Sequence, residues 1–387
     1  MRFAHAWMAA LALWGALSVT AFAAVNSGFF GKTDVFASAG AFSHVSADGA
    51  RFDDRAGGFR LTDDPAGGYR KDGSFTSEPL HYGFGFDKVV PSWNADCPAG
   101  TWVKVEVQTS PDGGDTWSVW YEVAAWGDPA ALDRLPSEGK VKLDAMGKVH
   151  EDTVELKAPA TRLRYRLALH TDRPEATPVV TLVAIAVQNT QRPVTPDDTP
   201  GPAWGKEVPA EYRSQLVENA DISWRICGPT STTMALTAHG VSLPTAAVAQ
   251  AAWDSLDGIY GNWPFLAAAG SRLMRENADS IPPMPGRKKL CQAYVLWCPD
   301  WKDVEAEIIA GNPVVMSMNF GKGELDGAPY DSTDGHLILV RGFTKDGDVI
   351  CNDPNARKES DGRVVYKRGQ LHNARHGGPV IVFRPYG

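Results

Sequence analysis

Three separate segments of the sequence contain the residue types that a thiol hydrolase needs. Cys227 begins the segment CGPTSTTMALTAHG, whose pattern predicts a helix ending near Gly240. Pro229 suits the first turn of such a helix, because an N–H group there would have no intrahelical partner. A helix N-terminus favours the thiolate, which is the nucleophilic form of cysteine. Cys227 is therefore a candidate nucleophile, and a small buried cysteine is the structural alternative.

A base for this thiol is expected at His336, in the segment DGHLILVRG. The apolar run predicts a strand with the ring of His336 at its end, facing the helix of Cys227. Asp353, in NDPNA, follows the next predicted strand, and a hairpin would bring its carboxylate beside His336. That carboxylate would fix the imidazole tautomer and stabilise the imidazolium. Asn352 is the alternative orienting residue, while a strand cap and an Asx turn are the structural alternatives.

Acyl transfer also requires a donor for the developing oxyanion. Gln215 lies in the segment VPAEYRSQ, a short way upstream of Cys227. Its side-chain amide and the backbone N–H of Cys227 together would form an oxyanion hole. Taken alone, Gln215 has the character of a surface residue.

The order of the segments VP…SQ, CGPTS, GHLILVRGF and NDPNA resembles the bacterial papain-like peptidases of cysteine peptidase family 39, with their bacteriocin-leader-peptidase-like domain. The resemblance runs from Val208 to the neighbourhood of Pro385 and is strongest to a secreted branch without a transporter. Ile226 departs from the family, where an aromatic residue is common at this position. The resemblance implies a papain-like α+β fold without a cofactor. It also implies the roles of nucleophile, base, orienting residue and oxyanion donor for Cys227, His336, Asp353 and Gln215.

The substrate implied by this resemblance is a peptide or protein, with a cell-wall peptide as one candidate. Relatives known for cutting double-glycine leader peptides are fused to membrane transporters, so that substrate class is not carried over. Amidases and acyl transferases share the fold and are not separated from peptidases by the sequence. The competing interpretation is a catalytically inactive papain-like scaffold in a protein that binds cell wall or glycan. The intact Cys, His, Asp and Gln argue against it.

The beginning of the chain has the three-part pattern of a secretory signal. Arg2 and His5 precede an apolar run, and Ala21-Phe22-Ala23 supplies the small residues of a cleavage site. We expect a signal peptide over residues 1–23, no membrane span after its removal, and a secreted or periplasmic protein. An uncleaved anchor is the alternative, but the run is shorter than the roughly 20 residues of a span. The net charge of -8 and the lack of a basic run exclude nucleic acid as an expected partner.

The five cysteines are an odd number, so in an exported protein at least one is unpaired. We expect Cys291 and Cys298 to form a short-loop disulfide while Cys227 stays reduced. A second bridge between Cys97 and Cys351 would cross a domain boundary and is not expected. A zinc knuckle and a histidine metal site are disfavoured, so no metal is expected.

Composition divides the remainder into two domains and a linker. Residues 24–189 contain alternating apolar runs between turn residues, which predict an all-β sandwich. Residues 190–207 are rich in Pro and predict a linker without helix or sheet. Residues 208–387 first show helical patterns, at 228–240, 243–256 and 304–311, and then strand patterns, which predict an α+β domain with antiparallel strands.

The predicted sandwich contains two notable aromatic features. Ser110–Trp117 fits the Asp-box pattern, in which Asp112 makes a hairpin turn and Trp117 packs under it. A single copy excludes a propeller and indicates a folding device. Trp93, Trp120 and Trp126 join Trp117 as candidate platforms for a glycan, and packing in the sandwich core is the alternative for these side chains.

Overall fold

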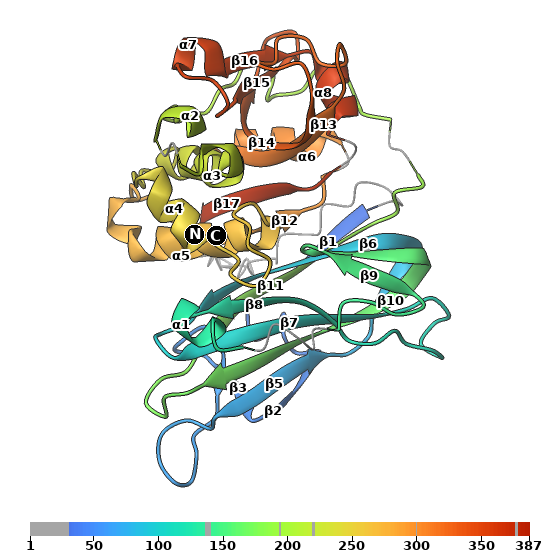
Figure 1. Cartoon of the computed structure of the whole chain (residues 1–387), viewed down its shortest axis with the longest axis vertical. Coiled ribbons are helices and arrows are strands. Elements are labelled where there is room, and N and C mark those ends of the chain that lie inside the picture. Colours follow the sequence, from blue (N-terminus) through green and yellow to red (C-terminus); the bar gives the residue numbers. More distant parts are fainter. Residues whose placement is uncertain (1–30, 136–140, 193–194, 219–220, 299, 376–377) are drawn as a thin grey trace, which may run out of the picture.

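The computed structural model describes residues 31–135, 141–192, 195–218, 221–298, 300–375 and 378–387. The predicted signal peptide, residues 1–23, lies outside the described residues. Figure 1 shows a β-rich N-terminal domain below and a domain with helices above, with β6 and β11 of the first facing α5, β12 and β17 of the second. Among the described residues, no helix is long and apolar enough to cross a membrane.

The N-terminal domain is built from eleven strands and one short helix. They are β1 (Gly31–Phe36), β2 (Val45–Asp48), β3 (Ala50–Asp53), β4 (Gly58–Leu61), β5 (Asp72–Ser77), β6 (Leu80–Asp96), β7 (Thr101–Ser110), β8 (Tyr121–Gly127), α1 (Pro129–Leu132), β9 (Gly147–His150), β10 (Thr153–Thr171) and β11 (Val179–Gln188). The prediction of an all-β domain is thereby confirmed.

A single hydrogen-bonded sheet takes the place of the two sheets that a sandwich would have. Its main path is β2-β5-β10-β6-β11-β4-β3. The long strands β6 and β10 have 17 and 19 residues and change partners along their length. β10 pairs with β6 and β9 near its start and with β5 and β7 near its end. Because β10 pairs with different strands near its start and near its end, the sheet bends around a core of alternating inward side chains.

The C-terminal domain combines helices with a six-stranded antiparallel sheet of order β12-β17-β13-β14-β15-β16. Its helices are α2 (Gln215–Glu218), η2 (Ser223–Arg225), α3 (Cys227–Thr237), α4 (Thr245–Ala251), α5 (Trp263–Glu276), η3 (Ala278–Ser280), α6 (Trp301–Ile309), α7 (Glu359–Gly362) and α8 (Arg368–Ala374). Its strands are β12 (Lys289–Leu296), β13 (Val314–Phe320), β14 (Thr333–Phe343), β15 (Val349–Asn352), β16 (Arg363–Tyr366) and β17 (Val380–Tyr386). The prediction of helices followed by antiparallel strands is confirmed, and α5 and β12 were not predicted.

Side chains of the N-terminal domain cover the exposed edge of β12. This strand ends the C-terminal sheet, so alternate N–H groups point away from its partner β17. The N–H of Ala293 donates to Asn94 Oδ1 (3.2 Å), and Asn94 Nδ2 donates back to the Ala293 carbonyl (2.6 Å). The N–H of Val295 donates to Ser92 Oγ at 3.0 Å, and that of Trp297 donates to Thr33 Oγ1 at 2.8 Å. The N-terminal domain therefore takes the place of a further strand.

Helix α5 forms the second part of the domain interface. Phe265 packs against Trp93 and Trp126 of the N-terminal domain, with ring centroids 5.7 and 5.6 Å apart. The first N–H of the helix, at Trp263, donates to Asp152 Oδ2 from the β9–β10 turn at 2.7 Å. A carboxylate beside this helix N-terminus satisfies a donor that has no intrahelical partner. The two domains consequently share one hydrophobic core.

The predicted disulfide between Cys291 and Cys298 is wrong, because all five cysteines are free. Cys291 lies within β12 and Cys298 just beyond its end. Seven residues of extended chain span about 23 Å, whereas a disulfide requires Cα atoms within about 7 Å. The two thiols also belong to different hydrophobic clusters, on opposite faces of the sheet. Cys97 and Cys351 are unpaired as well, as expected.

The predicted linker, residues 190–207, has no helix or strand among its described residues, but it is attached to both domains. At its start, Thr190 donates through its N–H and its hydroxyl to Asp87, at 2.8 and 2.7 Å. Farther along, the buried Arg368 donates to Asp198 Oδ1 at 2.8 Å and to the Asp197 carbonyl at 3.1 Å. Trp204 donates through Nε1 to a carboxylate of α6 at 3.0 Å. These bonds hold the linker against the surface of the C-terminal domain.

The aromatic side chains considered for glycan binding serve packing. Trp93 and Trp126 are buried and lie against Phe265 in the domain interface. Trp117 packs under the predicted Asp-box turn, where its Nε1 donates to the Gly114 carbonyl at 3.0 Å. Arginine side chains cover the rings of Trp117 and Trp120 at 4.3 and 4.4 Å. Core packing is therefore supported for Trp93 and Trp126, whereas Trp117 and Trp120 are half-buried beneath arginine side chains.

Replacement of Asn94 by Ala tests the importance of the covered strand edge. It leaves the N–H and the carbonyl of Ala293 buried without partners, so we expect a loss of about 2–4 kcal/mol in the free energy of unfolding. Urea denaturation followed by tryptophan fluorescence measures this loss. Asn373→Ala, at an exposed position of α8, is the control and should change stability by less than about 0.5 kcal/mol. Equal stability of the two variants would contradict the role assigned to Asn94.

Candidate active site

Cys227 is the first residue of α3, as the sequence pattern predicts. The helix buries nearly all of its residues, and Ser231 Oγ donates to the Leu337 carbonyl of β14 at 3.0 Å. Gly228 allows close packing here, because a Cβ atom at this position would lie 2.8 Å from Leu266 of α5. The half-buried thiol of Cys227 is thus held at a helix start that is fixed against both the sheet and a second helix.

His336 lies in β14, opposite Met318 of β13. Asp353 directly follows β15, which pairs with β14 through Leu339 and Asn352. This hairpin brings the carboxylate beside the imidazole, with 2.9 Å between His336 Nε2 and Asp353 Oδ1. The Cys227 thiol lies close enough to the imidazole for each group to shift the pKa of the other. Three segments that are far apart in the sequence therefore form one connected Cys–His–Asp cluster.

The Asp353 carboxylate is fully buried, and each of its oxygens accepts two hydrogen bonds. Oδ1 accepts from His336 and from the N–H of Asn355, both at 2.9 Å. Oδ2 accepts from the hydroxyls of Tyr330 and Tyr366 at 2.9 and 3.1 Å. The ring of Tyr330 also lies edge-on to that of His336, with centroids 5.2 Å apart. These contacts fix the orientation of both the carboxylate and the imidazole.

Sequence reasoning did not find the two tyrosines. Tyr330 lies in the segment ELDGAPY and Tyr366 in the segment VVYKRGQL. Their common partner is 23 residues from Tyr330 and 13 residues from Tyr366. No local pattern indicates such a contact, because it depends on the arrangement of β14, β15 and β16.

The charges of the cluster favour a thiolate–imidazolium pair. Burial alone would lower the pKa of His336, but the Asp353 carboxylate and the Cys227 sulfur outweigh it and raise this pKa. Burial would likewise raise the pKa of Cys227, whereas hydrogen bonding to His336 and its charge lower it. The pKa of Asp353 is lowered despite burial, because the imidazolium and four hydrogen bonds stabilise the anion. Each ionised group is stabilised by its neighbour.

Gln215 is the first residue of α2 and is buried. Its backbone N–H donates to the Pro354 carbonyl at 3.0 Å, so the residue is attached to the turn that carries Asp353. Its side-chain Nε2 donates to the Ser223 carbonyl at 2.9 Å, in η2 just before Cys227. This bond uses one of the two N–H groups of the amide. The structure thus brings Gln215 next to the segments that carry Asp353 and Cys227.

Asn352 does not orient the imidazole, because its Oδ1 accepts from Arg341 Nη1 at 3.2 Å. The same arginine donates to the carbonyls of Val208 and Ala210, at 3.0 and 3.2 Å. Arg341 thereby holds the segment that leads to Gln215 against β14. Asp353 is the residue that the structure places beside His336, in agreement with the first of the two sequence alternatives.

A cleft of about 770 Å³ lies between the two domains, beside this cluster. On one side it is lined by Trp224, just upstream of Cys227, and by Gly335, next to His336. On the other side it is lined by Glu151 and Asp152, from the β9–β10 turn of the N-terminal domain. We call it the interdomain cleft. Cys227, His336 and Asp353 are not themselves among the residues that line it.

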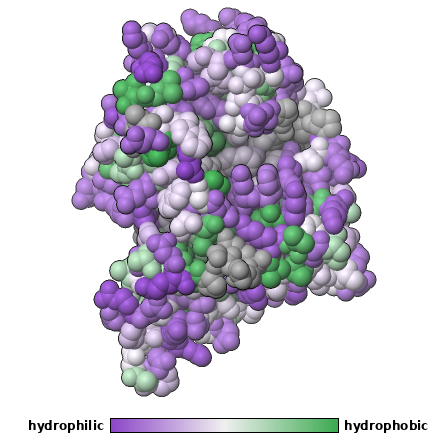
Figure 2. Space-filling view, viewed as in Figure 1, coloured by the Kyte–Doolittle hydropathy of each residue, from purple (hydrophilic) through white to green (hydrophobic). Residues whose placement is uncertain are grey.

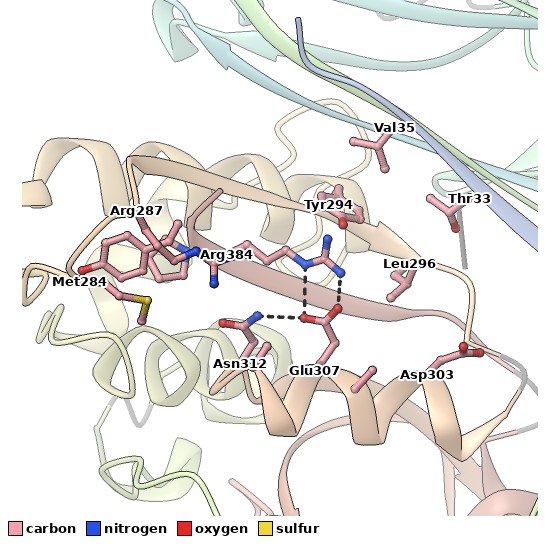
Figure 3. A pocket seen from close by; sticks show the side chains of 14 residues that line it. Thr33, Val35, Met284, Arg287, Tyr294, Leu296, Asp303, Glu307, Asn312 and Arg384 are labelled. Carbon is pink, nitrogen blue, oxygen red and sulfur yellow. Dashed lines mark hydrogen bonds and ion pairs between the residues drawn. The ribbon is translucent and has the colours of Figure 1, made fainter. Parts of the chain in front are cut away.

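A second pocket, of about 310 Å³, also lies between the domains, and like the interdomain cleft it is lined by none of the predicted site residues. Figure 3 shows Glu307 on α6 directed toward Asn312 and Arg384, and Asn312 Nδ2 donates to Glu307 Oε2 at 2.9 Å. The guanidinium of Arg384 is paired with the Glu307 carboxylate. The charged groups at the centre of this pocket are therefore bonded to one another.

Figure 2 shows that the viewed face of the molecule is mostly hydrophilic, with small separate hydrophobic groups.

Comparisons with known proteins agree with the resemblance of the sequence to cysteine peptidase family 39. Residues 32–188 match the Peptidase C39 N-terminal domain, and residues 207–375 match the Peptidase_C39 like family. The chain belongs to the C39-like peptidases. A comparison with curated proteins gave no match. Among solved structures, the chain is similar to a Bacillus anthracis protein described as a C39-like peptidase, at 16% identity and a TM-score of 0.32, covering 46% of this chain and 97% of that one.

Family membership indicates cysteine peptidase activity on a peptide substrate and gives both domains a place in the C39-like family. Four or more oxygen, nitrogen or sulfur ligands commonly hold a catalytic or structural metal. Within the described ranges, no group of three or more His, Cys, Asp or Glu residues is arranged to hold a metal ion.

The opposite pKa shifts of Cys227 and His336 predict an unusual pH dependence of thiol reactivity. The thiolate should persist below the ordinary pKa of cysteine, and the imidazolium should persist above the ordinary pKa of histidine. The rate of alkylation of Cys227 by iodoacetamide, measured against pH, should therefore rise at unusually low pH. Asp353→Asn removes the charge that raises the pKa of His336, so this rise should move to higher pH. An identical profile for the two proteins would contradict the coupling between Asp353 and the thiol.

Proposed function

We propose that this C39-like chain is a secreted cysteine peptidase that hydrolyses peptide bonds through Cys227, His336 and Asp353, with Gln215 as oxyanion donor. The observation that carries the proposal is the cluster in which Nε2 of His336 bonds the buried Asp353 carboxylate at 2.9 Å, while the thiol of Cys227, at the start of α3, lies close enough to the imidazole for the two groups to shift each other's pKa. Family membership supports the general chemistry.

In the proposed reaction, the Cys227 thiolate attacks the carbonyl carbon of the scissile peptide bond. The imidazolium of His336 gives its proton to the leaving amine, the C–N bond breaks, and a thioester remains on Cys227. His336, now neutral, removes a proton from water, which attacks the thioester; the C–S bond breaks, the carboxylic acid is released, and the Cys227 thiolate and the His336 imidazolium are restored. Asp353 keeps the imidazole in one orientation and stabilises its protonated form.

The oxyanion of the tetrahedral intermediates requires donors that are already in place. The backbone N–H of Cys227 stands at a helix start, where no intrahelical acceptor is available to it. The Gln215 side chain has one N–H committed to Ser223, so its second N–H is the one that we assign to the oxyanion. The bond from Gln215 N–H to Pro354 keeps this donor fixed relative to Asp353.

Secretion, the cleavage of residues 1–23 and the division at residues 189/190 and 207/208 remain parts of this proposal that derive from the sequence. A papain-like fold of the C-terminal domain is also proposed, on the strength of a nucleophile helix packed against an antiparallel sheet that carries His336. A peptide in an extended conformation would enter through the interdomain cleft. No observation on the described residues favours an inactive scaffold or a glycan-binding protein.

Substitution of the cluster residues tests the proposal. Cys227→Ala should abolish hydrolysis of a peptide-library substrate without loss of fold, because it only shortens a half-buried side chain. His336→Ala should be nearly as severe, since residues that act as a unit are not additive, and Asp353→Asn should be milder. Turnover is compared with thermal melts of each variant. Full activity of Cys227→Ala would place the catalysis elsewhere in the protein.

Gln215→Ala isolates the oxyanion donor. Loss of one such donor should lower kcat by about 10²–10³ while the thiol stays reactive toward iodoacetamide. The alkylation rate is the internal control, because it depends on the Cys227–His336 pair and not on an oxyanion. A parallel loss of turnover and alkylation would mean that Gln215 acts only by holding the segments of Cys227 and Asp353 together.

A further inference from the structure

The interdomain cleft presents carboxylates and a carbonyl oxygen that have no donors among the described residues. Glu151, in the β9–β10 turn, and Asp334, two residues before His336, are exposed, and neither side chain has a hydrogen bond or ion pair within the described ranges. Both residues line the cleft, one from each domain.

Asn262 adds a buried acceptor to the same cleft. It is only 3% exposed, and its Nδ2 donates to Asp254 Oδ2 at 2.8 Å. Its Oδ1 accepts from no donor in the part of the chain that the structure describes. A buried carbonyl oxygen without a partner is costly, so a donor supplied by a ligand would relieve this cost. Asn262 therefore points to a ligand with N–H groups.

Of the three Lys and Arg side chains that line the cleft, Lys88 and Arg225 are engaged by neighbouring groups and Arg375 is buried. Lys88 is paired with Glu155 at 3.4 Å. The guanidinium of Arg225 donates to the Gly258 carbonyl and lies over the rings of Trp224, Trp253 and Tyr260. The guanidinium of Arg375 lies 5.0 Å from the ring of Trp301 in the core, near the charges of Asp303 and Asp300, and its nitrogens have no hydrogen-bond partner among the described residues.

The remaining titratable groups at the cleft do not change this balance. The Asp152 carboxylate is buried, and it accepts from Trp263 N–H and from Thr153 Oγ1 at 2.7 and 3.0 Å. Glu155 is bonded to Lys88 and to Lys148, each at 3.4 Å. His150 is exposed next to Glu151 and carries no charge unless it takes up a proton.

We propose that the interdomain cleft binds a basic side chain of the peptide substrate, Lys or Arg, with Glu151 and Asp334 as specificity-determining carboxylates and Asn262 as a neutral acceptor. The inference rests on the proposed peptidase function and names the substrate class of the same site. Trp224, 75% exposed beside the cleft, offers an aromatic face to the same cation. The N-terminal domain would thereby supply one wall of the specificity site.

The test uses the full chain with the substitution Cys227→Ala, which binds substrate without cleaving it. Each fluorescent peptide pool has one defined position and random residues elsewhere. For every position there are two pools, one with Arg at that position and one with citrulline, its neutral isostere. We expect Arg pools to bind about tenfold more tightly than citrulline pools at one position, because a charge-assisted hydrogen bond is added. Glu151→Gln and Asp334→Asn in this background should each reduce the ratio toward one. Asp115→Asn, an exposed carboxylate outside the cleft, is the matched control and should leave the ratio unchanged.

Equal binding of Arg and citrulline pools at every position, or a ratio that Glu151→Gln leaves intact, would overturn the inference. The proposed function is measured separately, by turnover of neutral pools and by labelling of Cys227 in the unsubstituted chain. Turnover of neutral pools without an Arg preference would reject the specificity site and keep the peptidase. Absence of both turnover and labelling would reject the two together.

Discussion

Burial of the Asp353 carboxylate is the constraint on which the candidate active site depends. A fully buried anion is tolerated only when donors surround it, because its loss of hydration is not otherwise compensated. Here the donors come from β14, from the loop that carries Tyr330, from β16 and from the turn after β15 itself. The anion then raises the pKa of His336, and the imidazolium lowers the pKa of Cys227. The reactivity of a half-buried thiol is thus set by a carboxylate that does not touch it.

The turn that carries Asp353 also holds α2 and the chain upstream of Cys227 at the site. Tyr212 donates through its hydroxyl to the Asp353 and Ala356 carbonyls at 2.9 and 2.7 Å, and Gln215 donates to the Pro354 carbonyl. The backbone of the Asp353 turn therefore anchors the chain upstream of Cys227, while its side chain anchors His336. One turn connects His336, the chain that leads to Cys227 and Gln215, so displacement of any one of them would disturb the others.

The sequence predicts those features that depend on neighbours in the chain. Cys227 at a helix start, His336 in an apolar strand and Asp353 after a hairpin follow from local periodicity and turn residues, and the structure has each of them at the expected place. The tyrosine donors to Asp353, the pairing of Asn94 with β12 and the cap of α5 by Asp152 depend on contacts across many residues, which no local pattern encodes. The disulfide prediction failed for the same reason, since it used the number and spacing of cysteines and overlooked the strand that separates Cys291 from Cys298.

The domain interface gives a physical reason for regarding the two domains as one unit. The exposed edge of β12 and the first N–H of α5 would lack partners in an isolated C-terminal domain, because Asn94, Ser92, Thr33 and Asp152 supply them. Unpaired strand edges invite association with other chains, so the N-terminal domain protects the sheet that carries His336. The turn that caps α5 through Asp152 is also the turn that presents Glu151 to the interdomain cleft. The contact that stabilises the interface therefore also fixes the position of the cleft wall, and any shift between the domains would change both together.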